Sequence, residues 1–126
     1  MKGLVFEGNV IQGDRLGRTI GFPTANLKIK DGTVVPAGVF ACRATLPDGT
    51  VHPGMMNVGN RPTVNLGREL RVEIHLLDFG GDLYGQDLRV EIVEFIRGER
   101  KFDSLETLKA QLEQDRLSVR KLLGAR

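Results

Sequence analysis

The stretch VFACRATLPDGTVHPGMMNV, residues 39–58, consists of two extended segments joined by a tight turn. Val39–Leu46 and Val51–Val58 have the length and the apolar content of strands. Between them, Pro47-Asp-Gly49 is a turn sequence, because proline presets φ, aspartate bonds to the nearby backbone and glycine accepts a positive φ. We therefore predict a β-hairpin here, and the rest of the fold is built outward from it.

Other segments with strand patterns bring the predicted strands to about six in the first three quarters of the chain. They are residues 3–11, residues 27–30, Leu70–Leu77 and Leu88–Ile96. The last two are predicted to form a second pair, joined by Asp78–Asp87, a connection too long for a tight turn and suited to a mobile flap. Six antiparallel strands leave exposed edges unless they close, so we predict an all-β, closed or nearly closed barrel.

The final segment changes its hydrophobic period from two to about 3.6 residues, which predicts a helix. Asp103 is the predicted N-cap, with Glu106 three residues later, and Gly124 lies just beyond the end. No linker or repeat divides residues 1–126, so the helix is expected to pack on the barrel within a single domain. The residues expected to face the strands are Leu105, Leu108, Leu112, Val119 and Leu122.

The composition is that of an ordinary globular protein, with 40% hydrophobic and 27% charged residues. A net charge of +2 creates no field that demands nucleic acid or an anionic membrane, and neither is expected as a partner. No signal-peptide core or membrane-length apolar run is present. Cys42 stands alone in an apolar run, which indicates a small buried hydrophobe and a reducing, cytoplasmic location.

The stretch Gly17-Arg-Thr-Ile-Gly-Phe-Pro-Thr-Ala-Asn26 has the composition of a ligand-binding loop. Gly13, Gly17 and Gly21 recur every fourth residue, and such loops let the backbone approach a phosphate. Thr24 and Asn26 add oxygens that Mg²⁺ accepts, so the pattern predicts a magnesium-nucleotide site.

Two better-known phosphate loops do not fit this stretch. A P-loop requires a lysine and a following helix, whereas this chain has Arg18 at a spacing one residue short, and Pro23 prevents the helix. The glycine spacing of a dinucleotide fingerprint is also absent. The nucleotide would therefore be held by a β-rich scaffold.

Six ordered motifs over some hundred positions resemble the riboflavin kinase family. The resemblance implies a six-stranded antiparallel Greek-key barrel that transfers the γ-phosphoryl group of ATP to the 5′-hydroxyl of riboflavin, giving FMN and ADP with the help of Mg²⁺. The motifs are Gly8-Asn-Val10 with Gly13 and Gly17–Asn26, Gly38-Val-Phe40, Asn57–Thr63, Val72-Glu-Ile-His75, Asp78-Phe79 with Leu83-Tyr-Gly85, and Phe102–Leu108.

The resemblance also implies roles for individual residues. Gly13, Gly17 and Gly21 would cover the nucleotide phosphates with Arg18 as the local cation, and Thr24 would meet both phosphate and Mg²⁺. Asn26 would be the second metal ligand. Glu73 matches the family's catalytic carboxylate, which would orient the hydroxyl and accept its proton.

The strand pattern alone does not single out Glu73. It alternates with apolar residues as on any half-solvated strand, and Glu91 and Glu94 are comparable. The alternative interpretation is that Glu73 is a surface residue without a catalytic role. His75, two residues further along the strand, is expected to be structural.

The family places its flavin near the segment that enters the C-terminal helix and on the helix itself. Arg97, Phe102, Asp115 and Arg120 are therefore the candidate flavin contacts. The alternatives are that Phe102 packs against the helix and that the charged residues form a solvated face.

Bacterial members of this family usually form the C-terminal half of a bifunctional protein that also adenylylates FMN. This chain has no pattern for that half, so it is expected to be either a single-activity kinase or a separated domain whose partner, an FMN adenylyltransferase domain, is absent from these residues. Two alternative functions remain open at this stage: a non-catalytic barrel that binds nucleic acid, and an inactive flavin-sensing domain.

Overall fold

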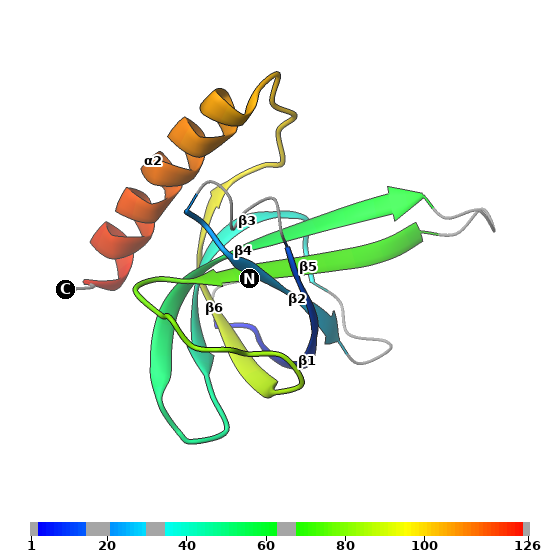
Figure 1. The fold of residues 1–126 in the computed structure, drawn as a ribbon, viewed down its shortest axis with the longest axis vertical. Helices are drawn as coiled ribbons and strands as arrows, with labels where there is room; N and C mark the ends of the chain where they lie inside the picture. Colours follow the sequence, from blue (N-terminus) through cyan, green and yellow to red (C-terminus); the bar gives the residue numbers. More distant parts are fainter. Residues whose placement is uncertain (1–2, 15–20, 30–34, 63–67, 125–126) are drawn as a thin grey trace.

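A computed structural model describes residues 3–14, 21–29, 35–62 and 68–124 of the chain. Its strands close into an antiparallel barrel in the order β1-β2-β5-β4-β3-β6, and one helix packs outside it (Figure 1). Sequential hairpins β3-β4-β5 flanked by β2 and β6 make the Greek-key arrangement. The predicted all-β barrel with a C-terminal helix is confirmed. The elements are β1 (Val5–Asp14), β2 (Thr24–Ile29), β3 (Gly38–Thr45), β4 (Val51–Pro62), β5 (Arg68–Leu76), β6 (Asp87–Arg97) and α2 (Leu105–Leu123).

The predicted hairpin is the β3–β4 pair, which runs in register from Gly38 opposite Val58 to Thr45 opposite Val51. Gly49 adopts a φ of 88°, which only glycine takes without strain, and its N–H donates to the carbonyl of Leu46 at 2.9 Å. The turn chemistry read from the sequence therefore determines this pair.

The predicted pairing of Leu70–Leu77 with Leu88–Ile96 is wrong. β5 pairs with β2 and β4, whereas β6 pairs with β1 and β3. The connection between them, residues 77–86, crosses one end of the barrel instead of closing a hairpin (Figure 1). Closure gives each strand two neighbours, and a connection of this length allows sequential strands to lie apart.

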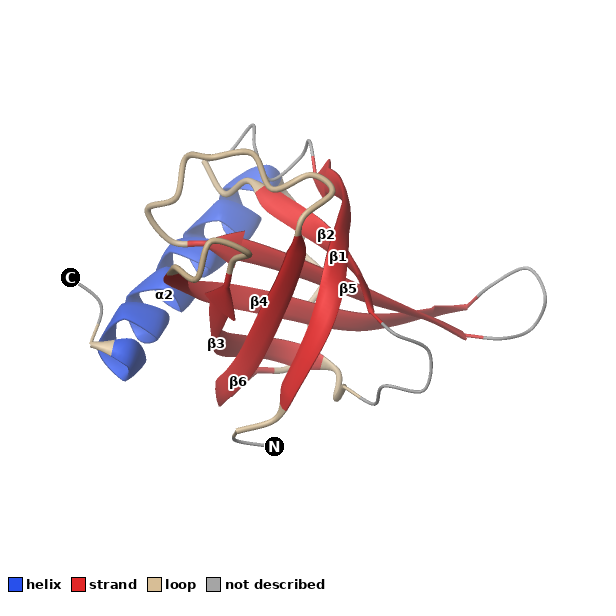
Figure 2. Ribbon diagram, turned by 90° about the horizontal axis from the view of Figure 1, so that it is seen from below, coloured by secondary structure: helices blue, strands red, loops and turns tan. Residues whose placement is uncertain are grey.

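The core has two parts, one inside the barrel and one between the barrel and α2. Inside, residues such as Phe40, Met56 and Ile74 are almost fully buried, and Cys42 is a buried hydrophobe as predicted. The second cluster lies on the outer face of the barrel, where α2 runs along one side (Figure 2). Its buried members are Phe22, Ala41, Met55, Leu77 and Val119.

The helix begins one residue later than predicted and turns a different stripe toward the barrel. Ser104 is the N-cap, not Asp103, because its backbone is extended and its hydroxyl accepts the Thr107 N–H at 3.2 Å. Gly124 ends the helix in the left-handed conformation, as expected. Leu105 and Leu122 are 49% and 45% exposed, so they do not belong to the buried stripe. The buried residues of the helix are instead Asp115 and Val119.

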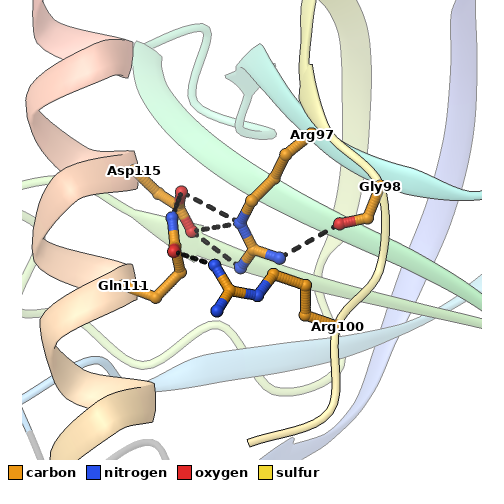
Figure 3. Close-up of polar contacts among 5 residues, drawn as sticks. All are labelled: Arg97, Gly98, Arg100, Gln111 and Asp115. Atoms are coloured by element: carbon orange, nitrogen blue, oxygen red, sulfur yellow. Dashed lines mark hydrogen bonds and ion pairs between the residues drawn. The ribbon is translucent and has the colours of Figure 1, made fainter.

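Asp115 is buried because it forms an ion pair with the last residue of β6 (Figure 3). Arg97 donates through Nε to Asp115 Oδ1 at 3.0 Å and through Nη2 to Oδ2 at 2.8 Å. Gln111 Nε2 donates to Asp115 Oδ1 at 2.9 Å, and Arg100 Nη1 donates to Gln111 Oε1 at 2.7 Å. This network attaches the middle of α2 to the end of β6.

Replacing Ser104 with alanine removes the side-chain acceptor of the first helical turn. We expect Ser104→Ala to lower the free energy of unfolding by about 1 kcal/mol in urea titrations followed by circular dichroism. Asp103→Ala is the matched control and should have little effect. A larger loss in the Asp103 variant would contradict the assignment of the cap.

Replacing Asp115 with asparagine keeps the shape of the side chain but leaves the largely buried Arg97 guanidinium without its anion. We expect Asp115→Asn to lower the free energy of unfolding by about 3 kcal/mol. Glu113→Gln, on the exposed side of the same helix, is the control and should change little. Equal stability of the two variants would show that the network does not hold the helix.

Candidate functional site

A continuous row of cross-strand partners crosses the outer face of the barrel. Asn26 on β2 lies opposite Glu73 on β5, and Glu73 lies opposite Asn57 on β4. The row continues through Val39 on β3 to Arg97 on β6. Directly paired residues point to the same face of a sheet. Glu73 therefore has Asn26 as its neighbour on one side. On the other side the row leads through Asn57 and Val39 to Arg97, which binds Asp115.

Thr24 and Asn26 lie on strand β2, which begins at Thr24 and not at residue 27 as predicted. Ala25 and Leu27 alternate with them and face the barrel core, so Thr24 and Asn26 face outward. Residues 24–26 of the predicted binding stretch are thus the start of a strand, and their polar side chains are held by the barrel.

The Glu73 side chain is mostly shielded, with 19% of it exposed. The Thr24 hydroxyl donates to its Oε2 at 3.4 Å, and Arg71 Nε lies 3.3 Å from its Oε1. Asn26 Oδ1 is buried and has no hydrogen-bond partner in the part of the chain that the structure describes. A buried oxygen without a donor beside a hydroxyl and a carboxylate fits a hard cation such as Mg²⁺.

The residues described include no cluster of three or more histidine, cysteine or acidic side chains that could hold a metal by themselves. A cation bound through Thr24 and Asn26 would have room for further ligands from a bound molecule. Mg²⁺ bound to phosphates fits this arrangement, because it takes few protein ligands.

The glycines predicted to cover the phosphates occupy different positions around this site. Gly13 lies in β1 opposite Ala25, and Gly21 has a φ of 86° just before β2. Gly17 and Arg18 fall outside the described residues. Gly13 and Gly21, the described glycines of this stretch, therefore both lie near the start of β2.

A cavity of about 650 Å³ lies at the end of the barrel, beneath the connection of residues 77–86. Thr24 lines it, so the cavity adjoins the carboxylate site. The connection is fixed to β1 at its far end, where Gly85 N–H donates to the Val10 carbonyl at 2.8 Å. The other lining residues come from the inner faces of the strands, from the residue before β2 and from the connection: Val10, Pro23, Ala25, Ile74, Leu76, Phe79, Gly80, Gly81, Asp82, Leu83 and Tyr84.

Three of the four candidate flavin contacts lie together. The Arg97 guanidinium lies 5.7 Å from the centroid of the Phe102 ring, and Arg97 also binds Asp115. Arg100 approaches the same ring at 5.2 Å, and Phe102 belongs to neither cluster of the described core. Arg120 lies elsewhere, where it forms a two-point ion pair with Asp78 at 2.8 Å for each bond.

Sequence reasoning did not assign a role to Arg71 or Asn57. Arg71 lies on the same outward face of β5 as Glu73, and Asn57 is the residue of β4 that pairs with Glu73. The alternation within β5 signals the first contact. The second depends on the register between strands, which is not readable from one sequence.

None of the described helices is long and apolar enough to cross a membrane. The family model described as riboflavin kinase matches residues 2–123. The bifunctional riboflavin kinase/FMN adenylyltransferase of Escherichia coli strain K12 is 44% identical over 118 residues, which cover 94% of this chain and 37% of that protein. The RNA-binding riboflavin kinase RibR of Bacillus subtilis strain 168 is 42% identical over 111 residues, covering 88% of this chain and 47% of that protein.

The chain thus spans between about a third and a half of the length of these curated relatives. A solved structure, riboflavin kinase from Trypanosoma brucei, superimposes with a TM-score of 0.70 at 24% identity and covers 98% of this chain and 82% of that one. That likeness supports the fold. Since the family model extends over almost every residue of the barrel and the helix, the chain belongs to the riboflavin kinase family.

Proposed function

We propose that this domain transfers the γ-phosphoryl group of ATP to the 5′-hydroxyl of riboflavin, giving FMN and ADP. The observation that carries the proposal is the position of Glu73 within the outer row. On one side lie Asn26 and Thr24, whose oxygens suit a metal-bound phosphate. On the other side, the row leads to Arg97 and the segment that enters α2.

The nucleotide is proposed to enter through the cavity beneath residues 77–86. The apolar inner-face residues suit a base, and Thr24 at the edge leads from the cavity to Glu73. The stretch containing Gly13, Gly17, Arg18 and Gly21 would cover the phosphates from the β1–β2 side. This arrangement brings the terminal phosphate to the outer face.

Thr24 and Asn26 would hold Mg²⁺ together with the phosphate oxygens. The ion would neutralise charge on the transferring group when it is bound. The buried, unpartnered Oδ1 of Asn26 supports this role within the described part of the site.

Riboflavin is proposed to lie along the outer face, with its ribityl chain toward Glu73 and its ring toward Phe102. Strands are about 4.8 Å apart, so the three steps from Glu73 to Arg97 span about 14 Å. A sugar-alcohol chain followed by a tricyclic ring suits this span. Arg97 and Asp115 bind each other and would position the segment that enters α2 around the flavin ring. Arg120 would contact the flavin from the region where it binds Asp78.

Glu73 is proposed to act as the general base. As the 5′-oxygen attacks phosphorus, the hydroxyl proton passes to a Glu73 oxygen, and the bond between the γ-phosphorus and the ADP oxygen breaks. Arg71 beside Oε1 and Thr24 beside Oε2 would fix the carboxylate in place. The main contribution of the site is positioning, because the transferred group needs little covalent assistance.

The name of the Bacillus subtilis relative supports a second candidate, RNA binding. Against it, this chain has a net charge of only +2 and one tyrosine with six phenylalanines, and single-strand binders combine a basic groove with several aromatic platforms. We therefore propose riboflavin and ATP as the ligands, without nucleic acid, in the cytoplasm. A domain that adenylylates FMN is the proposed next partner.

The carboxylate role is tested by Glu73→Gln, which preserves shape but cannot accept the proton. We expect formation of FMN from riboflavin and MgATP to fall by about 10²- to 10⁴-fold in kcat, with unfolding unchanged. Glu91→Gln, on the opposite part of the barrel, is the matched control and should retain activity. Full activity of the Glu73 variant would overturn the assignment, and absence of FMN from the wild type would overturn the proposed function.

The metal-nucleotide role is tested by Thr24→Ala. The variant should raise KM for MgATP and the Mg²⁺ concentration needed for half-maximal rate by about tenfold, because one charge-assisted ligand is worth about that factor. The dissociation constant for riboflavin, measured by quenching of flavin fluorescence, should stay within about twofold of the wild-type value. Equal loss of both affinities would indicate that the variant disturbs the barrel rather than the metal site.

A further inference from the structure

The backbone ladder between β2 and β5 ends beside the proposed metal site. Its pairs are Leu27 with Val72, Asn26 with Glu73 and Ala25 with Ile74. Pro23, two residues beyond Ala25, has no N–H and cannot extend the ladder. The backbone immediately before Thr24 therefore needs another attachment to β5.

The His75 side chain supplies this attachment. Its Nδ1 lies 2.7 Å from the carbonyl oxygen of Pro23. Because a carbonyl only accepts, Nδ1 carries the proton and donates. The His75 ring also packs against Phe22, with centroids 5.3 Å apart, and the Arg116 guanidinium of α2 covers the Phe22 ring at 4.5 Å. Residues 22 and 23 are thus held between β5 and the helix.

We propose that His75 is a positioning residue that fixes Thr24 beside Glu73 by binding the Pro23 carbonyl. Glu73 and His75 lie on the same face of β5, one step apart, and they contact Thr24 and Pro23, which are adjacent in the chain. Two neighbouring outward side chains of β5 therefore hold two consecutive residues at the entrance of β2. The expected effect of this contact on kinetics rests on the proposed function, whereas the contact itself does not.

The surroundings of His75 favour the neutral ring with the proton on Nδ1. Nε2 is buried and has no hydrogen-bond partner among the described residues. Burial lowers the pKa of His75 below its ordinary 6.5, and Arg116 lowers it further, while the Pro23 carbonyl and Asp78 oppose the shift. Asp78 is itself bound to Arg120, and Glu73 is an acidic group on the same strand face as His75. A second proton would place an unpaired donor in the core.

The experiment compares two variants that each retain one nitrogen of the ring. In His75→Asn the amide nitrogen takes the position of Nδ1 and still donates to Pro23, whereas in His75→Gln it takes the position of Nε2. We expect His75→Gln to raise KM for MgATP about tenfold, the value of one hydrogen bond, and His75→Asn to stay within about threefold of the wild type. Amide exchange at Thr24–Leu27 should accelerate in the Gln variant only.

Nitrogen NMR of the wild-type imidazole tests the geometry without any turnover. We expect a neutral ring protonated on Nδ1 that stays neutral below pH 6.5, so folding stability should fall as pH drops from that value while the unfolded chain takes up the proton. A ring protonated on Nε2, or equal kinetics and exchange in the two variants, would overturn the proposal. If the wild type made no FMN, the proposed function would fail, and the spectrum and the exchange rates would still decide the role of His75.

Discussion

The register of β2, β5 and β4 is the constraint on which the site depends. Asn26, Glu73 and Asn57 meet on the outer face only because Val72 and Ile74 fill the barrel interior on the alternate positions. A slip of one residue would exchange the two faces and bury a carboxylate among apolar side chains. The free energy that closes the barrel therefore also aligns the polar row.

The helix α2 packs on this outer face and contacts two separate regions of the proposed site. It covers β3, β4 and β6 with an apolar cluster and carries two ion pairs, one near its middle and one near its C-terminal end. Asp115 binds Arg97 at the end of the row, and Arg120 binds Asp78, where the connection over the cavity begins with a φ of 57°. A single rigid element thus contacts both the proposed flavin side and the lid of the proposed nucleotide cavity.

The elements that local chemistry determines were predictable from the sequence. The Pro47-Asp-Gly49 turn, the period-two strands and the C-terminal helix depend on residues close in the chain. What failed depends on contacts between distant segments. The β5–β6 pairing is wrong because closure assigns neighbours, and Asp115 in the buried stripe was missed because its burial depends on Arg97, eighteen positions away in sequence. Hydrophobic periodicity carries no information on such a charge pair.

Glu73 illustrates the same limit within the site. On sequence grounds it was no better a candidate than Glu91, since both alternate with apolar residues in a strand. In the barrel their neighbours differ: Glu91 lies 3.9 Å from Arg43 with both side chains nearly half exposed, whereas Glu73 is mostly shielded between Thr24 and Arg71. A carboxylate in solvent interacts mainly with water, and one enclosed by hydrogen-bonding groups has a fixed direction. The surroundings of this position therefore combine Arg71 of β5 itself with Thr24 of the neighbouring strand β2, and the Thr24 contact depends on strand pairing.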